Sequence, residues 1–261
     1  MARERVAAGV NLELRHLETP AGRIAALDYE PRRPRGVAIV AGHGYSSSKH
    51  NLDALCAFLA SHGFHVLSID FPGHKLGASG GVLRTIDDLT TAFGATVDFA
   101  LDRHAGVVYA MGHSMGAATA LRACAADPRV AGAISIATGY GRPAALDALR
   151  ARGVVDLRAG YVDGLTLPEV VAATEQIFDA ALAGLAGRPV LYVLADRDMM
   201  VSRRSVEELY ARAPEPKTLV EIASDHTTAG EHARGAVLAW LNELHPRTPL
   251  AGRAAAPSDA L

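Results

Sequence analysis

Residues 107–116 read Val-Val-Tyr-Ala-Met-Gly-His-Ser-Met-Gly, and an alanine-rich run continues to Ala126. The apolar residues that open this stretch predict a short buried strand, and the alanine-rich run predicts a helix. Only the turn Gly-His-Ser-Met-Gly separates the two elements. Gly112 and Gly116 leave room for that turn, because side chains there would collide with the neighbouring strand and helix. The turn is expected to hold Ser114 in a strained conformation with its hydroxyl clear of the backbone.

This G-x-S-x-G turn between a strand and a helix resembles the nucleophile elbow of the serine α/β-hydrolases. A serine hydroxyl is a poor nucleophile unless a base lies within hydrogen-bond reach, and the base needs a carboxylate that orients it. The resemblance therefore implies that Ser114 is the nucleophile. It also implies that an acid follows a later strand and a histidine follows the last strand.

His226 is the residue that we expect to act as the base. It follows a predicted strand at 218–222, at the carboxyl end of that strand, where ligands gather in open α/β sheets. His113 lies in the elbow, but we expect it to point along the neighbouring turn. The remaining competitors flank helices: His62, His65, His232 and His245.

Two aspartates compete for the role of the acid, Asp196 and Asp198. In the family pattern the acid lies about four residues beyond the apolar strand, an offset that Asp198 fits, with Ala195 in place of the usual glycine. Asp196 faces the other way if the chain is still extended. Asp225 adjoins His226 directly, and neighbouring loop side chains seldom form the required in-plane hydrogen bond. We therefore expect Asp198 to orient the base.

An oxyanion hole is implied by the same resemblance, built from two backbone N–H groups. One is the N–H of Met115, at a helix N-terminus whose dipole favours an anion. The other is the N–H of Tyr45, which follows His43-Gly44, a pair similar to the family's His-Gly pair. The residues expected to line the substrate pocket are His43, Gly44, Tyr45, His113 and Tyr140.

Strand-like and helix-like segments alternate along most of the chain. Two short antiparallel strands are predicted at 12–16 and 23–29. Further strands are predicted at 37–41, 64–69, 107–111, 130–137, 188–194 and 218–222, and helices at 52–61, 85–103, 117–126, 202–213 and 232–244. This order predicts an α/β-hydrolase fold, with a mostly parallel central sheet flanked by helices and joined by right-handed crossovers.

One segment breaks the alternation. Between Ala137 and Arg188 only helix-like stretches occur, at 142–152 and 168–185. In the superfamily that the chain resembles, an insertion at this place forms a lid, and an elaborated crossover is the alternative. We expect an α/β-hydrolase core at 1–139 and 188–246, a short lid insertion at 140–187 and a flexible tail at 247–261.

Composition and charge exclude several classes of protein. The 261 residues carry a net charge of −2, with 49% hydrophobic and 21% charged residues, an ordinary globular mixture. The scattered basic residues argue against a nucleic-acid surface, and no run approaches the ~20 apolar residues of a membrane span. The charged N-terminus is unlike an export signal, and Cys56 and Cys124 predict buried free thiols. These features favour a cytoplasmic protein.

No metal or cofactor is expected. His62 and His65 have a ligand-like spacing, but the histidine and aspartate cluster of metallohydrolases is absent. The stretch 42–44 lacks the third glycine and the lysine of nucleotide-binding loops. The expected partners are a small-molecule acyl substrate and water, and the sequence carries no signal for the oligomeric state.

The resemblance implies an acyl-transfer hydrolase. Within that class we expect a carboxylesterase for small or medium esters, because a short lid predicts an accessible pocket. Other hydrolases with this elbow and a small lid include monoacylglycerol lipases, thioesterases, acyl-peptidases, carbon–carbon bond hydrolases and cofactor-free haloperoxidases. A serine nucleophile argues against dehalogenases and epoxide hydrolases, which use aspartate. A protein of another class would bind a ligand on this fold with little or no turnover.

Overall fold

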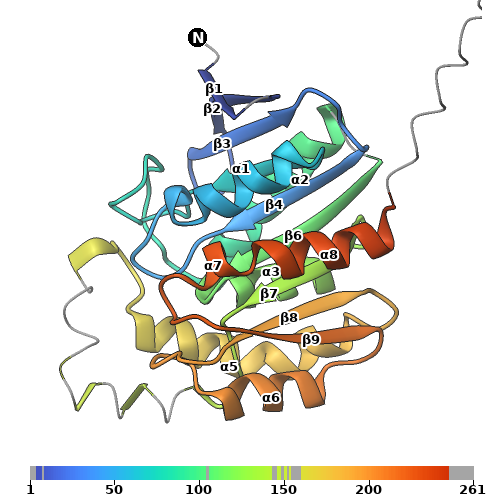
Figure 1. Cartoon of the computed structure of the whole chain (residues 1–261). Helices are drawn as coiled ribbons and strands as arrows, with labels where there is room; N and C mark the ends of the chain where they lie inside the picture. The colour runs from blue at the N-terminus through green and yellow to red at the C-terminus, as the bar shows by residue number, and fades with distance from the viewer. Residues whose placement is uncertain are drawn as a thin grey trace, which may run out of the picture.

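The computed structural model describes residues 4–7, 9–103, 106–142, 146, 147, 150, 151, 153 and 160–246. Within these ranges the chain forms a nine-stranded sheet with helices on both faces (Figure 1). The strands are β1 (Glu4–Ala7), β2 (Val10–Leu17), β3 (Ile24–Pro31), β4 (Val37–Gly42), β5 (His65–Ile69), β6 (Val107–His113), β7 (Val130–Ile136), β8 (Val190–Ala195) and β9 (Lys217–Ile222). The helices are α1 (Asp53–Ser61), α2 (Ile86–Arg103), α3 (Met115–Ala126), α5 (Leu167–Ala183), α6 (Arg203–Arg212), α7 (Ala229–His232) and α8 (Arg234–Leu244), with a short 3-10 turn η1 (Lys49–Leu52).

The sheet is parallel except at one end. Its strand order is β1-β2-β3-β5-β4-β6-β7-β8-β9. The strands β4 to β9 run parallel, whereas β1, β2 and β3 alternate in direction and β3 is antiparallel to β5. The predicted mostly parallel sheet is confirmed. Strand β1 was not predicted, because its four residues are too few to show a period. The predicted tail at 247–261 lies outside the described residues, as does most of 142–152.

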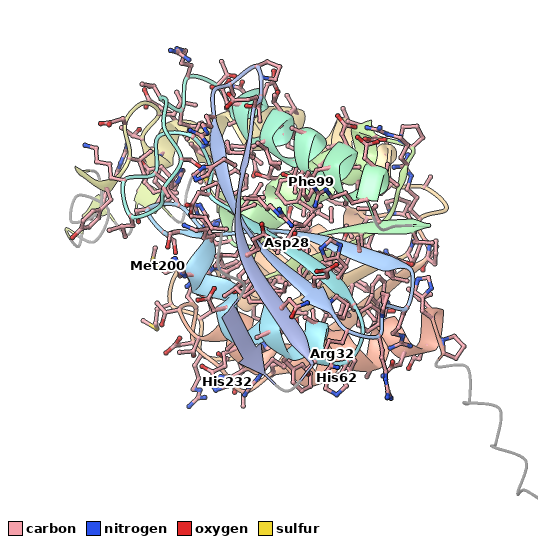
Figure 2. All side chains as sticks on the ribbon, turned by 90° about the horizontal axis from the view of Figure 1, so that it is seen from above. Asp28, Arg32, His62, Phe99, Met200 and His232 are labelled. Atoms are coloured by element: carbon pink, nitrogen blue, oxygen red, sulfur yellow. The ribbon has the colours of Figure 1, made fainter. Side chains whose placement is uncertain are left out.

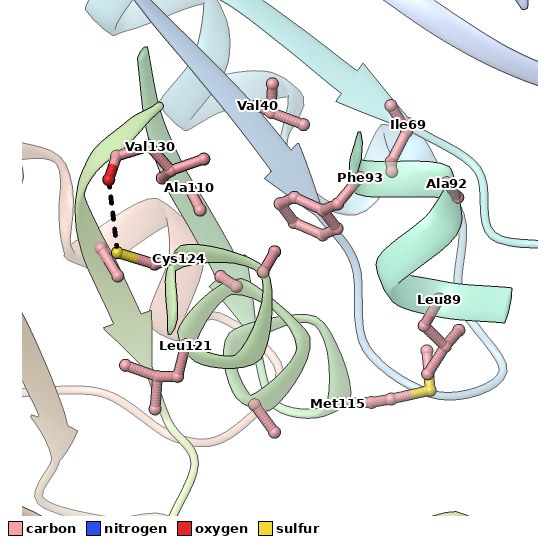
Figure 3. Packing of buried hydrophobic residues seen from close by; sticks show 14 of the residues in the cluster. Val40, Ile69, Leu89, Ala92, Phe93, Ala110, Met115, Leu121, Cys124 and Val130 are labelled. Carbon is pink, nitrogen blue, oxygen red and sulfur yellow. Dashed lines mark hydrogen bonds between the residues drawn. The ribbon is translucent and has the colours of Figure 1, made fainter. Parts of the chain in front are cut away.

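Two layers of buried side chains hold the helices on the sheet. On one face α1 and α8 contribute Leu55, Leu59, Val237 and Leu241 to a cluster with β4, β6 and β8. On the other face α2, α3, α5 and α6 pack over the opposite side of the same strands. Figure 3 shows part of that second layer, where Phe93 and Leu121 lie beneath the strands and the Met115 side chain extends beside Leu89. The strands β4 to β8 are buried on both faces, which explains their continuous apolar runs.

Residues with strained backbone conformations lie at the carboxyl edge of the parallel strands. Among the described residues, the non-glycine residues with positive φ are Ser46, Ser114 and Ala137, with φ of 55°, 53° and 52°. They follow β4, β6 and β7, which are neighbours in the sheet. Such conformations cost free energy and concentrate at functional sites, so this edge is the place to look for chemistry.

A separate hollow lies at the opposite edge. Pro31, Arg32, Ser61 and Gly63 contribute to its wall, and Figure 2 shows Arg32 close to His62 at this end of the molecule. Gly63 precedes β5, so this hollow lies at the amino edge of the parallel strands, away from Ser114. It therefore has no part in the site.

The two cysteines are buried and form no disulfide, as predicted for Cys56 and Cys124. Burial raises the pKa of the Cys124 thiol to about 11, which keeps the sulfur protonated and unreactive at neutral pH. Within the described ranges, no helix has both the length and the apolar character needed to cross a bilayer.

Candidate active site

Ser114 lies between β6 and α3 in a sharp turn. Its φ of 53° and ψ of −115° place it outside the ordinary regions for a non-glycine residue. Its N–H donates to the carbonyl of Ile136 on β7 at 2.9 Å, which fixes the turn against the next strand. A Cβ at Gly112 would overlap the Gly116 backbone, and one at Gly116 would overlap Gly42, so both positions need glycine. The predicted elbow geometry is present.

Asp198 and His226 form a close pair at the ends of β8 and β9. His226 Nδ1 lies 2.7 Å from Oδ2 of Asp198, so Nδ1–H donates and Nε2 is left as the hydrogen-bond acceptor. The other carboxylate oxygen of Asp198 accepts the N–H groups of Met200 and Val201 at 2.7 and 2.8 Å. The Asp198 side chain is 2% exposed, whereas the His226 ring is 14% exposed. The buried carboxylate of Asp198 thus holds an imidazole ring that is partly exposed to solvent.

The neighbouring aspartates have other partners. Asp196 accepts the N–H of Ser224 at 2.9 Å and so ties the loop after β8 to the loop after β9. Asp225 accepts from the N–H and hydroxyl groups of Thr227 and Thr228, which lowers the pKa of its carboxyl to about 2. Asp196 and Asp225 therefore shape the loop that carries His226, and neither contacts its ring.

His113 supports the backbone of His226 and does not point at Ser114. Its Nε2–H donates to the His226 carbonyl at 2.7 Å, and the two rings pack with centroids 4.7 Å apart. Burial lowers the pKa of His113 to about 3, so the ring is neutral and keeps one N–H for this bond. The contact brings the loop after β9 against the elbow.

The remaining candidate histidines are bound away from the elbow. Their hydrogen-bond partners are the Phe58 carbonyl for His62, Asp28 for His65, Ser224 for His232 and Tyr109 for His245. None of these contacts involves Ser114 or Asp198.

The loop after β4 approaches the elbow through Gly44. A Cβ at Gly44 would lie 3.4 Å from Cβ of Ser114 and 3.2 Å from Nδ1 of His113. The next residue is Tyr45, whose N–H was predicted to face the oxyanion. On the other side of Ser114, the N–H of Met115 belongs to the first turn of α3, where N–H groups have no acceptor within the helix. The structure thus places Gly44, the residue before Tyr45, against Ser114, while Met115 follows Ser114 directly.

Behind this loop lies a set of buried residues joined by polar contacts, here named the backing network: His43, Lys49, Asp70 and the backbone of Phe71. His43 is fully buried, its Nε2 accepts the Phe71 N–H at 3.1 Å and its Nδ1 donates to the Gly44 carbonyl at 2.8 Å. Because Nε2 must accept a hydrogen bond, the two bonds together need a neutral ring. Burial and the neighbouring charges of His74 and Lys49 lower the pKa of His43 to about 3, against the opposite effect of Asp70.

Asp70 is the anchor of the backing network. Burial alone would raise the pKa of its carboxyl, but the ammonium and the N–H of Lys49, both at 2.7 Å, and the N–H of Ala78 at 2.6 Å lower it. This carboxylate joins the loops after β4 and β5 at the carboxyl edge.

A small pocket adjoins the elbow on the side of α3, and we name it the Met115 pocket. Its wall is formed by Met115, Ala118, Thr138, Gly139, Arg142, Leu167, Val170, Val171, Thr174, Glu175 and Phe178. Half of this wall comes from α5, which packs on α3. Helix α5 begins with a capping box, in which Thr166 accepts the Glu169 N–H and the Glu169 carboxylate accepts the Thr166 N–H at 2.7 Å.

The residues that the sequence predicted for the substrate pocket are not among those that form the wall of the Met115 pocket. His43 and His113 are buried behind the backbone, with the partners described above. The Tyr45 hydroxyl donates to the Leu165 carbonyl at 3.0 Å. The Tyr140 ring has the Arg212 guanidinium 3.9 Å from its centroid, and its hydroxyl donates to Asp179 at 3.2 Å. Arg142 and Glu175 were not predicted from the sequence, because their place in the wall depends on how α5 packs.

No cluster of three or more histidine, cysteine or acidic residues with the geometry of a metal site occurs in the part of the chain that the structure describes. His62 and His65 have separate partners, Phe58 and Asp28.

The sheet, its connections and the serine elbow define the class of the α/β-hydrolases, as the sequence resemblance predicted. Residues 32–166 match the family described as serine aminopeptidase, S33. Because this match spans more than half of the chain, the protein belongs to the serine aminopeptidase S33 family of hydrolases. The match contains Ser114 and ends before Asp198 and His226.

Solved structures share this fold at low sequence identity. The esterase Pf2001 of Pyrococcus furiosus is 18% identical, with 90% of this chain and 91% of that chain covered and a TM-score of 0.67. The hypothetical protein PA2218 of Pseudomonas aeruginosa is 20% identical, with 94% and 99% covered and a TM-score of 0.73. Est1E of Butyrivibrio proteoclasticus, solved with ferulic acid, is 21% identical, with 88% and 98% covered and a TM-score of 0.69.

A curated relative matches over a shorter stretch. A protein of Mycobacterium phage D29, provisionally named a non-heme haloperoxidase, is 32% identical over 108 residues. These residues make up 41% of this chain and 38% of the phage protein. This chain therefore covers well under half of the relative's length.

Proposed function

We propose that the protein is a serine hydrolase that cleaves a carboxylic ester of a small or medium acyl chain through an acyl-enzyme. The observation that carries the proposal is the 2.7 Å contact between His226 Nδ1 and Asp198 on a loop packed against the strained Ser114 turn. The ester is favoured over other acyl compounds because Pf2001, which has the same fold, is named an esterase. At its level of identity Pf2001 supports the fold, and the substrate class remains the proposal.

In the proposed reaction, the Ser114 oxygen attacks the ester carbonyl carbon as Nε2 of His226 takes the hydroxyl proton. The carbonyl oxygen becomes an oxyanion, held by the N–H groups of Tyr45 and Met115. The Asp198 carboxylate stabilises the imidazolium. The carbon–oxygen bond to the alcohol then breaks, and the imidazolium gives its proton to the leaving oxygen.

The second half of the reaction uses water. His226 takes a proton from a water molecule, whose oxygen attacks the carbonyl carbon of the acyl-enzyme. The bond to Ser114 breaks, the serine oxygen takes the proton from His226, and the carboxylic acid leaves. Each half-reaction returns His226 to its neutral form.

We also propose that an insertion between two strands of the core covers this site. We propose the hydrolase core at 1–139 and 188–246 and the insertion at 140–187, as the sequence predicted. The support is that α5, from the insertion, forms half of the wall of the Met115 pocket. The insertion thus limits the size of the acyl group that reaches Ser114.

The family description favours a second candidate, an aminopeptidase that cleaves an amide by the same steps. Parallel assays of a 4-nitrophenyl acyl ester, the matching thioester and the 4-nitroanilide separate these reactions. We expect kcat/KM to be highest for the ester. A higher value for the anilide would replace the esterase proposal with the peptidase.

A fluorophosphonate probe separates an enzyme from a binding protein on the same fold. We expect stoichiometric labelling of the native protein and none of Ser114→Ala. The matched control is Ser135→Ala, which removes a buried hydroxyl from β7 and leaves Ser114 in place. Absence of labelling in the native protein, or equal labelling in Ser114→Ala, would overturn the proposed function.

A further inference from the structure

Arg142 is a buried cation in the wall of the Met115 pocket. The residue is 6% exposed, and its Nε is enclosed without a hydrogen-bond partner. Within the described part of the chain, no hydrogen bond or ion pair involves the Arg142 side chain. A guanidinium remains charged at every physiological pH and carries five N–H donors. Burying it without an acceptor costs several kcal/mol.

The other buried cations of the described residues differ from Arg142 in this respect. Lys49 donates to Asp70 at 2.7 Å. Arg122 donates to the Ile86 carbonyl at 2.9 Å and to Asp87 at 2.7 Å. Among these buried cations, Arg142 is thus the exception, because its side chain has no hydrogen-bond acceptor among the described residues. An exception of this kind in the wall of a pocket points to an acceptor that a ligand supplies.

The nearby carboxylates are engaged elsewhere. Oε1 of Glu175, in the same wall, accepts the Gly141 N–H at 2.7 Å. Both oxygens of Asp198 are engaged, one by His226 and the other by two backbone N–H groups. Burial lowers the pKa of the Arg142 guanidinium, and the fields of Asp198 and Glu175 raise it, so both lie close enough to act on its charge. Neither forms the hydrogen bonds that its N–H groups require.

The position of the pocket links this cation to the reaction. Met115, whose N–H is assigned to the oxyanion hole, belongs to the same wall. The charge of Arg142 also contributes to the lowered pKa of His113, the residue before Ser114. Ser114 directly precedes Met115, so an acyl group on Ser114 that enters this pocket meets the apolar side chains Val170 and Phe178 and the guanidinium of Arg142, which share its wall.

We propose that Arg142 determines specificity by binding a carboxylate at the far end of the acyl group. The substrate class is then a monoester of a short dicarboxylic acid. The apolar wall contacts the methylene groups, and the guanidinium forms charge-assisted hydrogen bonds with the terminal carboxylate. This inference rests on the proposed function, because it takes the Ser114 acyl-enzyme as its starting point.

Two esters of matched shape test the proposal. The 4-nitrophenyl monoester of glutaric acid ends in a carboxylate, whereas the 4-nitrophenyl ester of valeric acid has the same chain length and a methyl end. We expect kcat/KM to favour the glutarate ester in the native protein. In Arg142→Gln the ratio of the two kcat/KM values should fall roughly 10- to 100-fold, since a hydrogen bond to a charged group contributes about 1.5–3 kcal/mol. Arg142→Lys should restore part of the ratio.

Arg212→Gln is the matched control. Arg212 is a half-exposed arginine that packs on Tyr140, outside the pocket wall, so its removal should leave the ratio unchanged. An unchanged ratio in Arg142→Gln would overturn the proposal and leave Arg142 as an electrostatic support for Asp198. A preference for a carboxylate on the alcohol side, tested with the butyrate ester of 4-hydroxybenzoate, would also overturn it.

A binding measurement tests the same subsite without catalysis. We expect glutarate to raise the melting temperature of Ser114→Ala and valerate to leave it unchanged. Adding Arg142→Gln to Ser114→Ala should remove the rise that glutarate causes. If no ester is hydrolysed but glutarate still stabilises Ser114→Ala, the proposed function fails and the anion subsite stands. If esters are hydrolysed and glutarate has no effect, the subsite fails and the proposed function stands.

Discussion

Two regions near Ser114 differ in whether their buried charged groups have partners within the protein. In the backing network, Lys49 and Asp70 bind each other, and the nitrogens of His43 are both bound by backbone groups. In the Met115 pocket, Arg142 has no partner among the described residues. The first region is complete without a ligand, so it serves the fold. The second is incomplete, so it serves the substrate.

This difference predicts which substitutions lower stability and which lower turnover. Changes in the backing network should lower stability, and changes around the reacting groups should lower turnover while the protein stays folded. Four substitutions test the division, from the largest expected effect to the smallest.

Asp198→Asn should have the largest effect, on kcat. The amide can still accept the N–H groups of Met200 and Val201, so the loop should persist. An amide N–H facing Nδ1 favours the wrong imidazole tautomer and cannot stabilise the imidazolium, so kcat should fall by roughly 10⁴-fold. Steady-state hydrolysis of a 4-nitrophenyl ester measures this loss.

Asp196→Asn is the control for that experiment. Asp196 also accepts a backbone N–H, that of Ser224, and follows the same strand. Its kcat should stay within a few-fold of the native value. A larger loss at Asp196 than at Asp198 would overturn the assignment of the acid.

The pairing of Asp198 with His226 also indicates how far the sequence could predict the site. Ser114, Asp198 and His226 each lie just after a predicted strand, and the carboxyl ends of parallel strands share one edge. The alternation of strands and helices therefore predicted the fold, and the resemblance to the serine α/β-hydrolases pointed to these three residues. Strand β1 was missed because Glu4–Ala7 is short, and its pairing with β2 depends on an edge that the sequence does not mark.

The pocket could not be predicted in the same way. His43 was chosen because it belongs to the His43-Gly44 pair, and Tyr140 because it opens the segment expected to form the lid, but the partners of both depend on tertiary packing. His43 is held by the Phe71 N–H, and Tyr140 by residues of α5 and α6. Arg142 gave no signal, since an arginine at the start of a helix-like stretch is normally exposed. In the structure it is buried in a pocket wall that it shares with residues of α5.

Lys49→Met should have the next largest effect, on stability. It removes the ammonium that neutralises Asp70, a residue with no exposed surface, and leaves a buried carboxylate without its counter-ion. Removing one partner of a buried pair costs about 3–5 kcal/mol. Urea unfolding at pH 7 measures the free energy of unfolding.

Lys75→Met provides the comparison. Lys75 and Asp163 also form an ion pair, at 2.8 Å, but both side chains are about half exposed. Such a pair contributes about 0–1 kcal/mol. Equal losses in the two variants would show that burial does not set the importance of Lys49.

His43 should make stability depend on pH. The folded protein holds the pKa of His43 at about 3, below the ordinary value near 6.5, so the unfolded chain binds more protons between these two values. The stability that the neutral ring contributes is fully present above about pH 6.5 and is lost as the pH falls toward 3. At pH 5 this residue alone should reduce the free energy of unfolding by about 2 kcal/mol.

Unfolding of the native protein and of His43→Asn at pH 8, 6.5 and 5 measures that slope. The variant should be less stable at pH 8 but lose less stability on acidification. His50→Asn is the control, because the His50 side chain is mostly exposed and pairs with the partly exposed Asp53. The idea fails if His43→Asn keeps the native slope.

Thr166→Ala should have the smallest effect and belongs to the other region. Thr166 caps α5, which forms half of the wall of the Met115 pocket, and its loss should cost about 1 kcal/mol. Because the first turn of α5 carries Leu167 and Val170, a frayed turn should loosen the pocket and raise KM for the preferred ester before it changes kcat. Ser202→Ala is the matched control, since Ser202 caps α6 in the same way and α6 contributes nothing to that wall. If both variants raise KM equally, α5 does not shape the acyl site. If only Thr166→Ala does, the pocket depends on the packing of α5 in the way that the position of Arg142 requires.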